Sequence, residues 1–95
     1  MKIKDVRRRK KVKEKVRDTE TDKLMREKSR RIGVKIKYYR TLKGENQSVF
    51  SEKLGVSYQY LSRIECGKQT PSLPLLVKIA ELLEVDLAKL VSDTL

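Results

Sequence analysis

Apolar residues recur at helical spacing in the later part of the chain and are sparse at its start. Ile32, Ile36 and Tyr39 stand at positions i, i+4 and i+7, which predicts a first helix over residues 30–43. Gly44 can end this helix, because glycine tolerates the left-handed conformation that closes one. The pattern therefore predicts a regular helix with one apolar face.

Two short amphipathic segments, Gln47 to Leu54 and Ser57 to Cys66, flank the turn Gly55-Val56. Glycine permits a positive φ where the first segment stops, Val56 can seal the turn from inside, and Ser57 can cap the second segment. The turn, the cap and the apolar spacing together predict a helix-turn-helix. The apolar positions of the two segments are Phe50, Leu54, Leu61 and Ile64.

A fourth and a fifth helix are predicted after the loop at residues 67–71. Pro74 fits the first turn of the fourth helix, because N–H groups in a first turn have no hydrogen-bond partner within the helix and proline has no N–H. Side chains that can cap the remaining helices are Asn46, Ser72 and Asp86. The fourth helix has an apolar face of Leu76, Ile79, Ala80 and Leu83, and the fifth carries Leu87 and Leu90. The chain is therefore predicted to be all-α.

The first 29 residues contain no glycine or proline, and their apolar residues are few. Five consecutive cations, Arg7 to Lys11, oppose helix formation, whereas long straight side chains favour it. We expect residues 1–29 to be a basic extension that is disordered or conditionally helical, with an interruption at Thr19 to Asp22. Residues 30–95 are expected to form the folded domain.

The net charge of +11 is concentrated at the start of the chain. Residues 1–31 contain 15 Lys and Arg against 6 Asp and Glu, whereas the remainder contains 9 against 7. A cationic segment of this kind is either simply solvated or binds a polyanion such as a nucleic acid. Binding to a polyanion is favoured by the release of counterions as phosphates are neutralised. Beside a helix-turn-helix, the second interpretation is favoured.

The residue types that are missing exclude several classes of site. The chain has no histidine and a single cysteine, Cys66, so we expect no metal site of the Cys/His type, no internal disulfide and no cofactor. No glycine-rich phosphate loop or nucleophile motif is visible, so an enzyme is not predicted. Without a long apolar run or signal peptide, a soluble cytoplasmic protein is expected.

The outer face of the second short segment carries side chains that can read base edges: Tyr58, Gln59, Ser62 and Arg63. Gln59 can offer a donor and an acceptor to adenine, and Arg63 two donors to guanine, each pair worth about 1–3 kcal/mol of discrimination. Tyr58 can pack on a thymine methyl or donate to phosphate. The alternatives are that Gln59 and Ser62 are merely solvated, that Arg63 pairs with a neighbouring acid, or that the hairpin binds no ligand.

The span from Ile32 to Leu90 resembles the Cro/C1-type (XRE-family) helix-turn-helix domain of phage and bacterial repressors. The resemblance is carried by Gln47, the LGVS of residues 54–57, the LSRIECGK of residues 61–68, Pro71, and the spacing of Leu76, Ile79, Ala80 and Leu83. It implies a compact five-helix lambda-repressor-like domain, to which the basic amino-terminal extension is attached.

The resemblance also implies roles for individual residues. Gln47 would contact the DNA backbone and support the recognition helix, Lys68 would touch phosphate, and Arg40 would form a structural ion pair with Glu65. The predicted DNA-binding residues are Gln47, Ser57, Tyr58, Gln59, Ser62, Arg63 and Lys68. Three residues depart from the family pattern: Glu45 replaces an apolar residue, Ser51 an alanine, and Glu84 a glycine that ends the fourth helix. Of these, Glu45 can loosen helix packing, and a buried Ser51 needs a backbone acceptor.

The leading hypothesis is a sequence-specific DNA-binding transcriptional regulator, expected to be a repressor, that reads the major groove of double-stranded DNA with the helix at residues 57–66. The alternative is an antitoxin-like or adaptor module whose basic tail, residues 1–29, binds a partner protein. A homodimer on a palindromic site is a further expectation. Leu87, Leu90 and Leu95 can either form its interface or complete the core.

Overall fold

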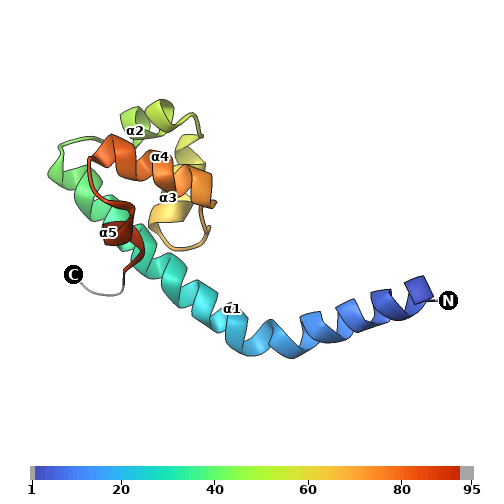
Figure 1. Cartoon of the computed structure of the whole chain (residues 1–95). Coiled ribbons are helices and arrows are strands. Elements are labelled where there is room, and N and C mark those ends of the chain that lie inside the picture. The colour runs from blue at the N-terminus through green and yellow to red at the C-terminus, as the bar shows by residue number, and fades with distance from the viewer. Residues whose placement is uncertain (1, 93–95) are drawn as a thin grey trace.

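The computed structural model describes residues 2–92, and side chains from residue 20 onward. These residues form five helices and no strand, which confirms the predicted all-α fold (Figure 1). The helices are α1 (Lys2–Leu42), α2 (Gln47–Leu54), α3 (Tyr58–Glu65), α4 (Leu73–Leu83) and α5 (Leu87–Val91).

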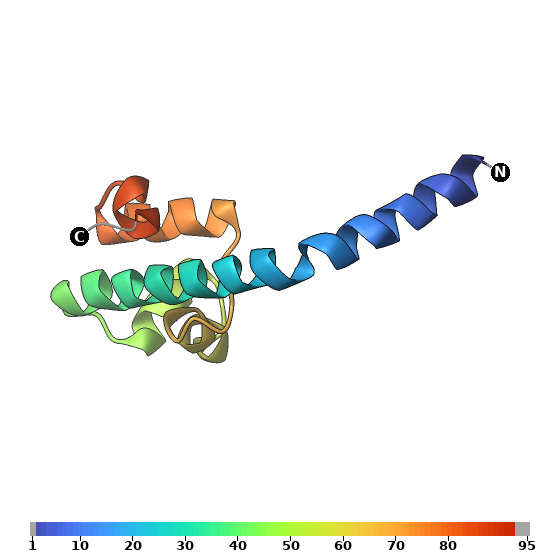
Figure 2. The same cartoon turned by 90° about the horizontal axis from the view of Figure 1, so that it is seen from below.

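The core lies where the later half of α1 meets the other helices. Figure 2 shows α1 running between α4 and α5 on one side and α2 and α3 on the other. Phe50, Ile36 and Leu90 are among the largest fully buried side chains. Leu90 therefore completes the core, whereas Leu95 lies outside the described residues. The other buried apolar residues are Ile32, Leu54, Leu61, Ile64, Leu76, Ile79, Ala80 and Leu83.

Side-chain caps begin α2, α3 and α4. The backbone N–H of Val49 donates to Asn46 Oδ1 at 2.8 Å, and that of Tyr60 donates to Ser57 Oγ at 3.0 Å. Ser72 Oγ accepts from the N–H of Leu75 in the same way at 3.3 Å. Each bond satisfies one of the N–H groups that a helix start leaves without an internal partner. Asp86 occupies the cap position of α5, but its side chain makes no capping hydrogen bond.

A tight turn joins α2 to α3. Gly55 has a φ of 79°, and the N–H groups of Gly55 and Val56 both donate to the carbonyl of Ser51 at 3.0 Å. Val56 packs against the core from this turn. Lys78 of α4 donates to the carbonyl of Leu54 at 3.1 Å and so closes the end of α2 from outside.

Helix α1 is longer than the sequence pattern suggests. It is helical through residues 19–22, so the predicted interruption there is wrong. Threonine and aspartate each lower helix stability by only a few tenths of a kcal/mol. No glycine or proline lies in this stretch to interrupt the backbone hydrogen bonds of the helix. The amino-terminal part of α1 projects away from the domain (Figure 1). No helix in the described part of the chain is long and apolar enough to cross a bilayer.

The packed part of α1 begins ahead of residue 30. Ser29 is buried, and its hydroxyl is hydrogen-bonded to that of Thr70 in the loop after α3. The helix has no break between residues 29 and 30. A domain boundary at residue 29 therefore remains a prediction, and Ser29 belongs structurally with the folded part.

Two of the unusual polar residues are accommodated locally. Ser51 is buried and donates to the carbonyl of Ser48 at 2.9 Å, so it has the backbone acceptor that it needs. Glu45 accepts from Lys53 at 2.9 Å through Oε2, while its Oε1 is buried without a hydrogen-bond partner among the described residues. The acid at position 45 is therefore paired but incompletely satisfied.

Gly33 allows α1 to cross directly over the end of α3. A Cβ at this position would lie 2.3 Å from the carbonyl oxygen of Ile64 and 2.8 Å from that of Glu65. Real Cβ atoms do not approach backbone oxygens this closely, and neither helix can shift without disturbing the core. The glycine is thus required by the helix crossing.

Replacing Gly33 by alanine should lower the free energy of unfolding by about 2 kcal/mol or more, because overpacking against backbone exceeds the roughly 1 kcal/mol that alanine adds in helix propensity. Urea unfolding followed by circular dichroism measures the change. Lys37→Ala, at an exposed position of the same helix, is the control and should stay within about 0.5 kcal/mol of wild type. A Gly33→Ala variant as stable as the control would contradict the close crossing.

Glu84 ends α4 in a left-handed conformation, with a φ of 59° and a ψ of 42°. Glu84→Gly should raise stability by about 0.5–1 kcal/mol, because glycine adopts this conformation without the steric penalty of a side chain. The ion pair that is lost, with Lys43 at 3.2 Å, is exposed and contributes little. Thermal unfolding should show a rise of a few degrees. Glu81→Gly, inside the last turn of α4, should instead lower stability by about 1 kcal/mol.

Candidate nucleic-acid interface

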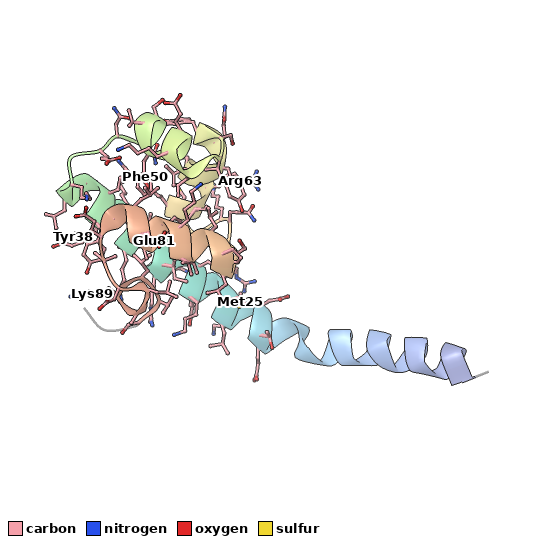
Figure 3. The ribbon with its side chains drawn as sticks, turned by 45° about the horizontal axis from the view of Figure 1, so that its top comes forward. Met25, Tyr38, Phe50, Arg63, Glu81 and Lys89 are labelled. Atoms are coloured by element: carbon pink, nitrogen blue, oxygen red, sulfur yellow. The ribbon has the colours of Figure 1, made fainter. Side chains whose placement is uncertain are left out.

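Helix α3 turns its apolar side inward and its polar side outward. Leu61 and Ile64 are fully buried, which fixes the rotation of this short helix about its own axis. Figure 3 shows Arg63 at the edge of the domain, whereas Phe50 of α2 points into the centre. The outward residues are Tyr58, Gln59, Ser62 and Arg63, of which Ser62 is partly buried and the others are exposed. The face predicted to read bases is therefore accessible.

The ends of α2 and α3 present further polar groups. Ser57 is exposed at the cap of α3, where its oxygen accepts from the N–H of Tyr60 and its hydroxyl hydrogen is left for another acceptor. Lys68 is exposed in the loop after α3, and its N–H donates to the carbonyl of Arg63 at 2.9 Å. This backbone bond places Lys68 next to the last turn of the outward face.

A buried ion pair fixes the position of α3 within the domain. Arg40 of α1 donates through Nε to Glu65 Oε2 at 2.7 Å and through Nη2 to Oε1 at 3.0 Å. The two residues are 7% and 6% exposed. Parallel bonds of this kind are both stronger and more directional than a single one. They hold the carboxyl-terminal end of α3 against α1.

Gln47 joins this pair from the start of α2. Its Nε2 donates to Glu65 Oε1 at 2.8 Å, while Nη1 of Arg40 donates to the carbonyl of Glu45 just before α2. The amide group of Gln47 has two hydrogens, so one is left for another acceptor. Helices α1, α2 and α3 therefore meet at one carboxylate, and the side chain of Gln47 is oriented by it.

Glycines at helix contacts are the functional positions that the sequence pattern did not predict. Gly33 permits the crossing of α1 and α3, and Gly67, with a φ of 79°, lets the loop after α3 pass beside α1. A Cβ on Gly67 would lie 2.8 Å from the Cα of Arg30. For Gly33, the available sequence signal is a glycine inside an otherwise helical stretch, where it costs about 1 kcal/mol relative to alanine and so points to a packing reason.

No group of three or more residues of the types that bind metal lies close together in the part of the chain that the structure describes. Cys66 is exposed and unpaired beside the outward face. The chemistry of the surface is that of hydrogen-bond donors, amides and cations, the groups that bind phosphate and base edges.

Arg40→Met should lower the free energy of unfolding by about 3–5 kcal/mol, because it leaves the carboxylate of Glu65 buried without its cation. The double variant Arg40→Met, Glu65→Leu should recover much of this loss, since two apolar side chains of similar volume need no partner. Urea unfolding of the two single variants and the double variant gives the coupling energy. If the double variant loses as much stability as the two single variants added together, the two residues do not stabilise the fold as a pair.

Known proteins match both the sequence and the fold. The family described as helix-turn-helix matches residues 36–90. The HTH-type transcriptional regulators SinR of Bacillus licheniformis and of Bacillus subtilis (strain 168) are each 43% identical to this chain over 63 residues, which is 65% of this chain and 57% of each regulator. The uncharacterized HTH-type transcriptional regulator MJ0272 of Methanocaldococcus jannaschii is 51% identical over 47 residues, 50% of this chain and 71% of that protein.

The fold is similar to that of the restriction-modification controller protein C.AhdI from Aeromonas hydrophila. The TM-score is 0.62 at 26% sequence identity, over 65% of this chain and 94% of that one. The match with the SinR regulators spans less than two thirds of their length. Because the helix-turn-helix family matches residues 36–90, more than half of the sequence, this chain belongs to the Cro/C1-type helix-turn-helix family.

Proposed function

We propose that this protein is a sequence-specific DNA-binding transcriptional regulator that inserts α3 into the major groove of double-stranded DNA. The observation that carries the proposal is the division of α3, whose apolar side is fully buried while its polar side is exposed. Relatives that share the family are transcriptional regulators by name. Repression would follow if the bound protein covers a promoter and excludes polymerase.

The base contacts are proposed for Gln59 and Arg63. They stand four residues apart on α3, so they lie on one face about one helical turn from each other. Gln59 has the donor and acceptor that adenine requires, and Arg63 has the two donors that guanine requires. Tyr58, at 51% exposure, and Ser62 lie on the same side and complete the contact with the groove.

The phosphate contacts are proposed for Gln47, Ser57 and Lys68. Gln47 and Ser57 each retain one hydrogen after their bonds within the protein, and each stands at a helix start, where the dipole favours an anion. Lys68 adds a charge beyond the end of α3. Contacts of this kind position a protein on DNA, whereas base contacts select the sequence.

The assembly and the cellular setting belong to the same proposal. A two-fold dimer would place two copies of α3 on half-sites about one helical turn apart, so the operator would be a palindrome. We propose that this protein acts in the cytoplasm.

Gln59→Ala with Arg63→Ala should abolish discrimination between an operator and unrelated DNA, because the two side chains supply about 1–3 kcal/mol of selectivity each. The operator is first selected by the wild-type protein from a random duplex pool. Fluorescence anisotropy then measures binding of wild type and variant to that operator and to a scrambled duplex. The affinity for the operator should fall about 100-fold or more, and the affinity for the scrambled duplex far less.

Lys89→Ala is the control, because it removes one exposed cation from α5 and leaves α3 untouched. It should retain the preference for the selected operator. Thermal unfolding of all three proteins shows that they are folded. The proposed reading role of α3 fails if the double variant binds the operator as tightly as wild type does.

A further inference from the structure

Helix α1 lies against the loop that follows α3. The side chains of Arg26 and Ser29 on α1, with Gly67, Lys68 and Thr70 in the loop, line a shallow cavity of about 210 Å³. The hydrogen bond between the hydroxyls of Ser29 and Thr70 fixes how the two segments are aligned. Arg26 is therefore held beside Lys68, the residue proposed to bind phosphate.

Arg30 is held at the same contact one turn later. A Cβ on Gly67 would lie 2.8 Å from the Cα of Arg30, so the loop backbone passes directly against α1 at this point. Lys68 in turn is bonded through its N–H to the carbonyl of Arg63 on α3. Cations thus continue from the outward face of α3, through the loop, onto α1.

The cations of this surface have no carboxylate partner among the described residues. Arg26, Arg30 and Lys68 are exposed, and none of them forms an ion pair or side-chain hydrogen bond with another residue whose side chain the structure describes. Lys23 stands three residues before Arg26 and extends the same stripe along α1. Asp22, which also lines the cavity, offsets only one of these charges. Figure 3 shows this part of α1, marked by Met25, on the same side of the domain as Arg63.

We propose that Arg26 and Arg30 bind backbone phosphates of DNA next to the base pairs that α3 reads, as a continuation of the Lys68 contact. The proposal rests on the function proposed above and adds a second segment to its interface. Exposed, unpaired cations gain affinity for DNA by releasing condensed counterions, whatever the base sequence. The protein would therefore cover more DNA than the helix-turn-helix alone, and α1 would add affinity without adding selectivity.

The test is the salt dependence of binding. Arg26→Gln with Arg30→Gln keeps two good helix formers and removes two charges. The slope of log affinity against log salt concentration should become shallower by about 1.8, or about 0.9 for each lost phosphate contact. Affinity for the selected operator and for a scrambled duplex should fall by the same factor, so the preference between them should be unchanged.

Lys37→Gln with Lys89→Gln is the matched control, because it makes the same change in net charge at exposed positions away from the loop after α3. Its salt slope should equal that of wild type. An operator duplex trimmed to the bases that α3 reads gives a second measurement, on which wild type and the Arg26/Arg30 variant should bind alike. The proposal would be overturned if the two double variants had equal salt slopes. It would also be overturned if wild type still bound the trimmed duplex more tightly than the Arg26/Arg30 variant.

The two proposals fail in different ways. If wild type binds no duplex with a preference, the proposed function fails. If wild type prefers its operator but the Arg26/Arg30 variant keeps the wild-type slope, only the role of α1 fails. Cations that serve instead to bind an acidic partner protein would give this second result.

Discussion

The buried ion pair between Arg40 and Glu65 is the interaction on which the arrangement of the helices depends. Two charges removed from water lose their hydration, so they are tolerated only where geometry and further hydrogen bonds compensate. Here the carboxylate accepts two bonds from Arg40 and one from Gln47. Since these three residues belong to α1, α2 and α3, the requirement to satisfy one carboxylate sets the relative position of three helices. A pair of this kind contributes alignment more than net stability.

The pattern of apolar residues predicted α2 to α5 and their buried faces, because each helix hides one side against the same core. It could not predict where backbones cross, since periodicity reports which face of a helix is apolar and not what lies on it. The helical pattern around Gly33 gives no sign of what lies against it, although its lack of a side chain is what admits α3. The interruption expected at residues 19–22 was wrong because polar composition alone does not break a helix. The exposed face of α3 could be predicted from its buried face, because the two lie on opposite sides of the helix. The bases that this face would read could not be predicted from the sequence.

Selectivity and charge are separated along this chain. The face of α3 contains amide, hydroxyl, phenol and guanidinium groups, each with directional hydrogen bonding. The cations are concentrated in α1, with 15 of the 24 lysines and arginines in residues 1–31. Electrostatic attraction acts over about 10 Å at ordinary salt and is insensitive to base sequence. In the proposed interface, α1 would increase the residence of the protein on DNA in general, and α3 would determine where it stays.

The continuity of α1 changes what its amino-terminal part needs in order to become helical. An isolated peptide must first form a helical nucleus, which is unfavourable by a factor of about 1000. In this protein the core already holds residues around Ile32 and Ile36 in the helix, so the nucleus exists before the extension is ordered. Each further residue then adds by propagation, with an equilibrium constant near one for good helix formers. The helical part of the extension can therefore grow or shrink one residue at a time, on the timescale of helix growth, while the domain stays folded.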